Sequence, residues 1–289
     1  MDLTAGVLRD AVEVADIRTH LEAFQRIADA NDGNRATGTA GFDASVAYVA
    51  GRLSAAGYQV DRQALSVGDV PSVNLVVERA GTLPEVVMLG AHLDSVAAGA
   101  GINDNGSGVA TLLVIAERLA DLPTPSKTVR LALWGAEEGG PYGSRTYVEA
   151  LAPDELARIG VYLNFDMLGS PNFIRFVYDE AAAAPGSGEL TTLFARHFES
   201  EGLAWEPIDL DGDSDHGPFA AAGIPTGGLF SGGIEPKTEE QASAFGGRAG
   251  VPADACSHRG CDTIANLDDT ILEEMADAIC HALVTLANP

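Results

Sequence analysis

Apolar residues recur along the chain with two periods, which predict helices in some segments and strands in others. Helical spacing runs over residues 16–30 and 42–57, and the second segment ends at Gly57, a typical helix stop. Short, nearly continuous apolar runs predict buried strands at 72–80, 85–93, 128–135, 161–168 and 173–178. Further helices are predicted at 108–120, near 188–202 and at 267–287.

Apolar strands separated by helices are typical of an α/β fold. We therefore predict a mixed, mostly parallel central β-sheet that is sandwiched by α-helices. The sequence shows no linker, so residues 1–289 are assigned to one globular domain, with residues 1–15 as an N-terminal extension. In such folds the ligand site lies beyond the carboxyl ends of the strands. Polar residues at those ends are therefore the first candidates for function.

The charge balance narrows the classes of partner. The 289 residues include 17 basic and 42 acidic side chains, which gives a net charge of −25. A chain this acidic repels nucleic acids and anionic membrane surfaces, so neither is expected as a partner. The excess of carboxylates can attract cations, whether metals or a substrate's ammonium group, or it can serve only solubility.

The sequence carries no visible targeting segment. No apolar run approaches the ~20 residues that span a bilayer. The N-terminus also lacks the basic start and the continuous apolar segment of a signal peptide. The chain is therefore expected to be either a mature secreted form or a cytoplasmic protein.

The stretch AHLDSVAAGAGINDNGSG, residues 91–108, holds three chemically active side chains at the end of a predicted strand. His92 and Asp94 are two residues apart and so point to the same side of the strand. A histidine that donates its second N–H to a carboxylate is fixed in the orientation that metal binding requires. The glycines let the backbone turn back towards the strand end. Asp104 then precedes a helix whose N-terminus favours a carboxylate.

Other strand ends add more side chains that can bind metals. Glu137 and Glu138 follow a predicted strand, and because neighbouring side chains point in different directions, one can bind a metal while the other faces substrate or water. Asp166 stands in an apolar run, where a carboxylate is costly unless a metal or hydrogen bonds satisfy it. His258 lies in the loop CSHRGC. Two histidines and at least three carboxylates suit a pair of zinc ions with Asp104 as the bridge.

The three cysteines have two interpretations. Cys256 and Cys261 can close a small disulfide loop, which would favour an oxidising compartment, and two reduced thiols are an equally good interpretation. Cys280 lies on the apolar stripe of the predicted helix at 267–287 and is interpreted as core packing.

Six motifs occur in one order within residues 16–287: GAHLDSVAAGAGINDNGSG, WGAEE, NFDMLGSPN, SDHGPF, GIPTGGLFSG and CSHRGCD. Together they resemble the co-catalytic di-zinc aminopeptidases of the secreted Streptomyces type. The resemblance implies a zinc-exopeptidase fold of the phosphorylase/hydrolase-like type and a monomeric enzyme. It also implies two Zn²⁺ ions and a peptide substrate with a free N-terminus, from which the first residue is hydrolysed.

The resemblance further implies a role for each side chain of the site. The implied zinc ligands are His92 and Asp166 for one ion, Glu138 and His258 for the other, and Asp104 as the bridge. Glu137 would be the general base that takes a proton from a metal-activated water and passes it to the leaving amine. Asp94 would orient His92 from behind. The peptide bond between Asp104 and Asn105 is expected to be cis, as it often is in this family.

Five further positions are implied to contact the substrate. Met167 and Phe230 match the pocket for its first side chain, which implies a preference for large apolar residues. Gly212 matches a backbone position near the free amino group. Ser257 stands where members of the family usually carry a tyrosine that helps to stabilise the oxyanion. A serine side chain is too short to reach the same point. Asp213 stands where the Streptomyces enzymes carry an arginine near the product's carboxylate. Because the charge at this position is reversed, we hypothesise that the enzyme admits basic or amidated substrates.

The remaining acidic residues carry weaker signals. Some family members bind calcium, and the candidate ligands here are Asp10, Glu13, Glu273 and Asp277. A solvated acidic face is the alternative interpretation of that group. Asp215 and His216 are interpreted as structural residues that cap the short helix around GPFAAAG.

Three other functions stay open. A dipeptidase or another amidase can use the same metal centre. A glutaminyl-cyclase-like transferase shares this fold but works with a single zinc, and a full set of ligands for two metals argues against it. A non-catalytic binding module typically loses ligands or the base, whereas every such side chain is present in this chain.

Overall fold

Eight strands form one mixed sheet at the centre of the computed structural model, which describes residues 3–179, 184–209 and 211–289. The strands are β1 (Asp61–Val67), β2 (Val70–Arg79), β3 (Leu83–His92), β4 (Lys127–Trp134), β5 (Ile159–Phe165), β6 (Phe176–Tyr178), β7 (Glu206–Ile208) and β8 (Thr226–Phe230). Their order in the sheet is β1-β2-β4-β3-β5-β8-β6-β7. The four neighbours β4, β3, β5 and β8 are parallel, and β2 pairs with β1 and β4 in the antiparallel sense. The predicted α/β fold is confirmed.

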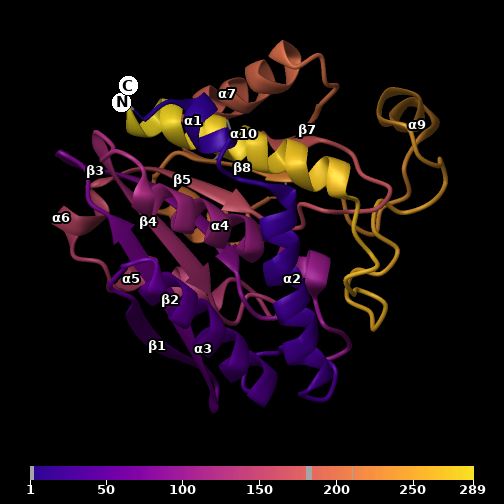
Figure 1. The fold of residues 1–289 in the computed structure, drawn as a ribbon, viewed down its shortest axis with the longest axis horizontal. Helices are drawn as coiled ribbons and strands as arrows, with labels where there is room; N and C mark the ends of the chain where they lie inside the picture. The colour runs from indigo at the N-terminus through magenta and orange to yellow at the C-terminus, as the bar shows by residue number, and fades with distance from the viewer. Residues whose placement is uncertain (1–2, 180–183, 210) are drawn as a thin grey trace.

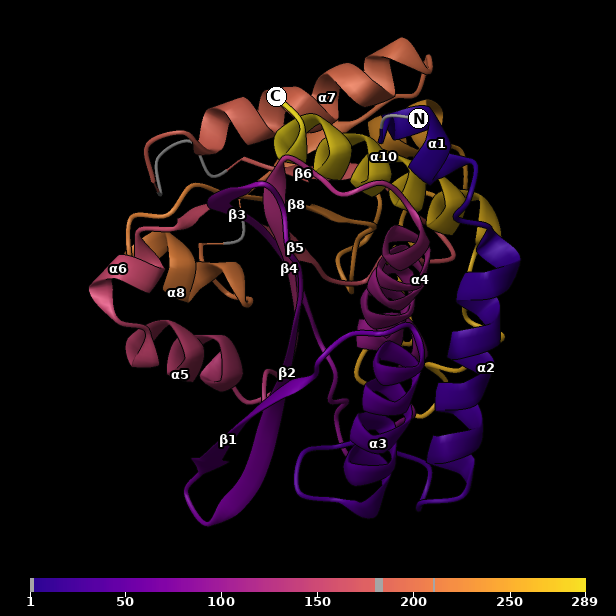
Figure 2. The ribbon, with the colours of Figure 1, turned by 60° about the vertical axis from the view of Figure 1, so that its left-hand side comes forward.

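Helices cover both faces of this sheet (Figures 1 and 2). One layer holds α1 (Ala5–Arg9), α2 (Val14–Asp29), α3 (Ala40–Ala55), α4 (Gly108–Asp121), α7 (Ser187–Ser200) and α10 (Asp269–Ala287). The opposite layer holds α5 (Tyr142–Ala150), α6 (Pro153–Leu156) and α8 (His216–Ala221). A short helix, α9 (Glu239–Phe245), lies away from both layers in the segment after β8 (Figure 1). Among the described residues, no helix is both long and apolar enough to cross a membrane.

Two apolar cores hold the layers to the sheet. The larger core lies between the sheet and the layer of α2, α4 and α10, and the smaller one is built around Trp134, Tyr162 and Phe219 on the other face. Leu8 and Val12, in the segment predicted as an N-terminal extension, are buried in the larger core, and α1 packs against α10. The described part of that segment is therefore integrated into the domain.

Strands β1, β7 and β8 lie outside the predicted set. β1 is an edge strand whose residues are mostly exposed, so it lacks an apolar run. β8 contains Gly227 and Gly228, and a Cβ atom at either glycine would lie within 2.7 Å of a neighbouring atom. Close packing against Leu190 and the Asn164 carbonyl thus requires glycines, which weaken the strand pattern in the sequence.

Candidate active site

The carboxyl ends of three adjacent parallel strands bring the predicted ligands together. β3 ends at His92, β4 is followed by Glu137 and Glu138, and β5 is followed by Asp166. The loop between β3 and α4 returns to the same place and carries Asp104. The position that the sequence predicts for the site, beyond the carboxyl ends of the strands, is therefore the one observed.

Two groups of three ligand side chains share Asp104. In the first group, His92 Nε2 lies 3.3 Å from Asp104 Oδ1 and 3.3 Å from Asp166 Oδ1. In the second, His258 Nε2 lies 3.1 Å from Asp104 Oδ2 and 3.1 Å from Glu138 Oε2. Within the described residues these are the two groups of three or more such side chains whose ligand atoms lie within 4.8 Å of one another. Each Asp104 oxygen faces a different imidazole, which is the arrangement of a bridging carboxylate.

The electrostatics of these groups fit cations. Glu138 Oε1 is buried and, among the described residues, has no hydrogen-bond partner, a costly state that a metal ion would relieve. Burial also raises the pKa of Glu138 and holds the pKa of Glu137 well above its ordinary range. Hydrogen bonds to Asp104 and Glu138 raise the pKa of His258 to about 10. Clustered buried carboxylates of this kind are stable where a divalent ion supplies the missing positive charge.

Backbone contacts fix the loop that presents Asp104. Gly101 has a φ of +61°, and a Cβ atom there would lie 2.4 Å from the carbonyl oxygen of Asp104. The Asp104–Asn105 peptide bond is cis, as predicted. Asn105 Nδ2 donates to the carbonyl oxygen of Phe165, and Asn105 Oδ1 accepts from the amide of Met167. The loop is thereby fastened to the end of β5.

Arg35 braces the same loop from inside the protein. Its guanidinium is fully buried and donates to three main-chain carbonyls, those of Leu93, Ala100 and Gly101, at 2.6–2.8 Å. Burial lowers the pKa of Arg35 to about 10, so the group remains charged at neutral pH. A positive charge behind the acidic loop offsets part of the repulsion among its carboxylates.

Asp94 supports the site differently from the prediction. The nearest acceptor to His92 Nδ1 is the main-chain oxygen of Asp94 at 3.1 Å, whereas the Asp94 carboxylate lies 3.8 Å away. That carboxylate instead accepts hydrogen bonds from the amides of Glu137 and Glu138 and from the hydroxyl of Thr37. These competing donors hold the carboxylate away from the imidazole. Asp94 therefore orients His92 through its backbone and positions the two glutamates through its side chain.

A chain of buried hydrogen bonds ends on Asp166. Trp134 Nε1 donates to the hydroxyl of Tyr162, which donates to Asn164 Oδ1. Asn164 Nδ2 donates to Ser214 Oγ, and Ser214 Oγ donates to Asp166 Oδ2 at 2.8 Å. One carboxylate oxygen of Asp166 is thus held by the protein, and the other faces His92.

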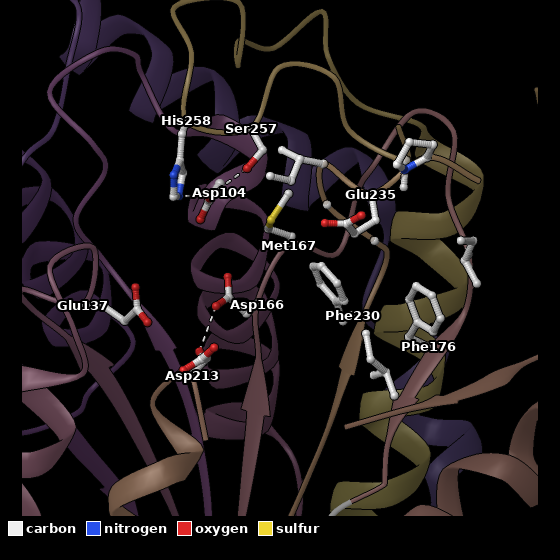
Figure 3. Close-up of a pocket in the computed structure, with 18 of the residues that line it drawn as sticks. Asp104, Glu137, Asp166, Met167, Phe176, Asp213, Phe230, Glu235, Ser257 and His258 are labelled. Carbon is white, nitrogen blue, oxygen red and sulfur yellow. Dashed lines mark hydrogen bonds and ion pairs between the residues drawn. The ribbon is translucent and has the colours of Figure 1, made fainter. Parts of the chain in front are cut away.

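A cavity of about 690 Å³, here called the large cavity, opens beside these ligands. Glu137, Asp104 and Asp166 face it, and Met167, Phe176 and Phe230 form its apolar side (Figure 3). Asp213 and Ser257 line it as well. Ser257 Oγ lies 3.4 Å from Asp104 Oδ2, a long hydrogen bond that points at the bridge.

Gly212 lies elsewhere. The described residues that line the large cavity do not include Gly212, which instead lines a separate cavity of about 430 Å³ near α5 and α8. Its predicted contact with the substrate's amino group stays a prediction.

Asp215 corrects part of the helix-cap interpretation. It occupies the position before α8, but its side chain accepts no hydrogen bond from the helix amides. Its carboxylate is fully buried on the side of the site, and burial raises its pKa to about 7. The backbone there has helical angles, whereas a capping residue typically has extended ones. His216, the first residue of α8, is also buried.

A disulfide joins Cys256 to Cys261, with the two Cα atoms 5.2 Å apart. His258 lies inside this small loop with a positive φ of 59°, and its side chain is 60% exposed. The loop therefore brings a histidine from the solvent side onto Glu138 and Asp104. Cys280 is buried in α10, in agreement with a packing role.

Calcium binding by the four predicted ligands stays a prediction. Neither group of three or more ligand side chains in the described residues includes any of the four. Arg9 lies 4.0 Å from Asp277 and pairs with Glu201 at 3.0 Å, so a cation of the protein already lies among these acids.

Sequence reasoning missed several residues that build the site. These are Arg35, Ser214, Asp254 and Asp262. Ser214 and Asp262 stand inside motifs quoted above, SDHGPF and CSHRGCD, so their place in the motifs was the available signal. Asp254 accepts from Asn103 Nδ2 at 2.7 Å, and like Arg35 it had no local signal.

Comparison with known proteins identifies the family. The profile of Peptidase family M28 matches residues 74–283. Leupeptin-inactivating enzyme 1 of Streptomyces exfoliatus is 44% identical over 280 residues, which cover 95% of this chain and 62% of that protein. An aminopeptidase of Pseudomonas aeruginosa is 48% identical over 213 residues, 71% of this chain and 40% of that protein. The chain thus spans less than two thirds of the length of these relatives.

Solved structures share the fold. An aminopeptidase from Aneurinibacillus sp. strain AM-1 superposes with a TM-score of 0.81 at 16% identity and covers 99% of this chain and 97% of that one. BSAP, a zinc aminopeptidase from Bacillus subtilis, superposes with a TM-score of 0.64 at 28% identity over 76% of this chain and 51% of that one. The glutaminyl cyclase of Porphyromonas gingivalis has the same fold, with a TM-score of 0.75 at 18% identity over 96% of this chain and 99% of that one. Because the family profile matches most of the chain and a relative is 44% identical over 95% of it, this protein belongs to peptidase family M28.

Proposed function

We propose that this chain is a di-zinc aminopeptidase that hydrolyses the N-terminal residue from peptides. The observation that carries the proposal is the pair of histidine–carboxylate groups that share Asp104, with the carboxylate of Glu137 beside them. The names of relatives agree, since they include aminopeptidases and a zinc aminopeptidase.

The ligand sets define where the chemistry occurs. His92, Asp104 and Asp166 would hold one Zn²⁺, and Asp104, Glu138 and His258 the other. When bound, zinc lowers the pKa of water to about 7 and polarises a carbonyl group. The protein's own part is to aim these ligands from rigid strand ends and to keep one carboxylate, Glu137, available for proton transfer.

The proposal assigns the role of general base to Glu137. Its side chain is only 12% exposed, lines the large cavity, and has Oε2 3.8 Å from His92 Nε2. Its backbone amide donates to Asp94 Oδ1 at 3.1 Å, which holds the backbone that presents the side chain. Glu137 takes the proton from the attacking water as the first peptide carbonyl is attacked, and passes it to the leaving amine.

The surrounding carboxylates account for cleavage at the N-terminus. Glu137 and Asp166 face the large cavity and attract the substrate's free ammonium group. The apolar side formed by Met167, Phe176 and Phe230 takes the side chain of the first residue, which favours large apolar residues.

The Cys256–Cys261 disulfide favours an oxidising compartment, because cytosolic thiols are usually kept reduced. This supports secretion over a cytoplasmic location.

Zinc analysis combined with a substrate panel tests the proposal. The purified protein should bind two zinc ions per chain and hydrolyse leucine p-nitroanilide but not the N-acetylated compound. Chelation should abolish turnover, and zinc should restore it. One zinc per chain with cyclisation of N-terminal glutamine would instead support a glutaminyl-cyclase-like transferase. A zinc-loaded protein inert towards every unblocked peptide would refute the aminopeptidase.

A further inference from the structure

A second, smaller cavity adjoins the candidate active site on the side of Glu138. It has a volume of about 350 Å³ and is here called the side groove; its walls include Val67, Val70, Val96, Ala97, Glu138 and Tyr142. Glu138 lines both the side groove and the large cavity. A candidate metal ligand therefore stands on the wall between the two.

Three of the four exposed large apolar side chains among the described residues line one of these two cavities. In the described part of the chain four large apolar residues are exposed: Val70, Leu83, Tyr142 and Ile234. Val70 and Tyr142 line the side groove, and Ile234 lines the large cavity. Apolar surface that gathers at the two sides of one catalytic centre is typical of binding subsites.

The walls of the side groove are held in place. Val70 packs on the backbone of Gly38 so closely that a Cβ atom on that glycine would lie 2.4 Å from Val70 Cγ1. The Tyr142 ring has the guanidinium of Arg145 5.9 Å from its centre. β1 and β2, which carry Val67 and Val70, lie at one edge of the sheet, with α3 beside them (Figure 2).

We infer that the side groove binds the side chain of the second residue of a peptide substrate and prefers it to be apolar. The inference rests on the proposed function. The large cavity takes the first residue, so the leaving part of the peptide must continue past the metal ligands on another side. One extended residue spans about 3.3–3.6 Å, so a groove walled by Glu138 lies within reach of the residue that follows the cut bond.

Two tripeptides that differ only in the second residue test this assignment. Leu-Phe-Gly and Leu-Ser-Gly share the first residue, so the ratio of their kcat/KM values isolates the second position. We expect the zinc-loaded protein to favour Leu-Phe-Gly at least about tenfold in kcat/KM, because burying one aromatic side chain stabilises the bound substrate by at least that factor. Val70→Ser and Tyr142→Ala should each lower this ratio about fivefold or more.

The chain offers a matched control. Leu83 is as exposed as Val70 but lines neither cavity, so Leu83→Ser should keep the wild-type ratio. Thermal unfolding of each variant checks that its fold is intact. If one of the two groove variants does not fold, the other still tests the inference. A wild-type ratio near one, or groove variants that behave like Leu83→Ser, would overturn the inference.

A substrate without a second amino-acid residue separates the side groove from the aminopeptidase activity itself. Hydrolysis of leucine p-nitroanilide with an unchanged tripeptide ratio rejects the side groove alone. If no peptide is hydrolysed, the aminopeptidase is rejected, and calorimetric titration with the two tripeptides still compares their binding. A ratio of dissociation constants near one would then reject the side groove as well.

Discussion

Asp262 holds Asp104 by its backbone. Asp262 Oδ2 accepts from the amide of Asp104 at 3.0 Å, and Oδ1 accepts from the preceding amide, that of Asn103, at 2.8 Å. Both oxygens of one buried carboxylate thus hold two consecutive amides of the loop that presents the bridging ligand. The direction of the Asp104 side chain depends on this pair of hydrogen bonds.

Asp262→Asn should therefore weaken zinc binding. The amide nitrogen of asparagine would face a backbone N–H, so one of the two hydrogen bonds is lost and Asp104 shifts. Loss of such an outer contact typically costs about 10–100-fold in metal affinity. Competition with a chromophoric zinc chelator measures the effect. Asp154→Asn, at an exposed position in α6, is the matched control, and equal affinities in the two variants would contradict the role of Asp262.

Substitutions at Glu137 and Glu138 should have different effects, because the first residue is proposed as the general base and the second as a zinc ligand. Glu137→Gln removes the proton acceptor but no predicted ligand, so kcat should fall about 10²–10⁴-fold while two zinc ions remain bound. Glu138→Gln should instead release zinc from the group that contains His258. Mass spectrometric zinc analysis beside steady-state kinetics distinguishes the two. Wild-type turnover in Glu137→Gln would require another base.

The sequence was informative where local pattern decides position. Apolar runs indicate where strands end, and β3, β4 and β5 all end within a few residues of candidate ligands. The connection of parallel strands then places those ends at one edge of the sheet. His92, Glu138 and Asp166 could be predicted for that reason, without knowledge of any contact between them.

Contacts between distant segments could not be predicted in the same way. Ser214 donates to Asp166 across 48 residues, and Asp262 accepts from Asp104 across 158. Neither contact leaves a periodic trace, because each depends on how loops pack. The buried position of Arg35 could not be predicted either, since a single arginine in a loop is ordinarily exposed. The spacing of His92 and Asp94 predicts a contact through the Asp94 carboxylate, because the sequence does not reveal the amides of Glu137 and Glu138 that compete for it.

Asp213 should raise the relative rate for basic substrates. It is exposed and lines the large cavity, so its carboxylate can attract the side chain of an N-terminal arginine. Asp213→Ala should lower the ratio of arginine to leucine p-nitroanilide turnover about two- to fivefold, since an exposed ion pair contributes about 0.5–1 kcal/mol. The difference in this ratio between the wild type and Asp213→Ala should become smaller in 1 M salt, which screens the charges. An unchanged ratio rejects the hypothesis, and Asp154→Ala controls for net charge.

Arg35→Lys should destabilise the domain although it conserves charge. The three carbonyls are served by three separate guanidinium nitrogens, whose positions the single nitrogen of a lysine cannot all occupy. The Gly101 carbonyl keeps a second donor, the amide of Gly106, so one or two buried carbonyls lose their only donor. At about 1–3 kcal/mol for each, the free energy of unfolding should fall by about 1–6 kcal/mol. Urea denaturation measures this change. Arg26→Lys, in an exposed pair with Glu22, should change it by less than about 1 kcal/mol.

His197 should make the fold sensitive to acid. Its ring is buried in α7 against the ring of His281, 4.9 Å away, and burial together with His281 lowers the pKa of His197 to about 4. The unfolded chain binds a proton near pH 6.5 and the folded one only near pH 4. Stability from the neutral imidazole is therefore complete above pH 6.5 and is lost as the pH falls to 4, by at most about 3 kcal/mol.

Two variants with opposite expected effects on the loss of stability in acid isolate the contribution of His197. His197→Gln removes the titration, so the free energy of unfolding should fall less between pH 6.5 and 4 than in the wild type. Burial raises the pKa of Asp277 to about 6, so its stabilising effect is present at low pH and is lost as the pH rises through 6. Asp277→Asn should accordingly steepen the loss of stability in acid. Urea unfolding at pH 7, 5.5 and 4 measures all three proteins, and because each keeps the same candidate zinc ligands, parallel curves would show that neither residue governs the acid response.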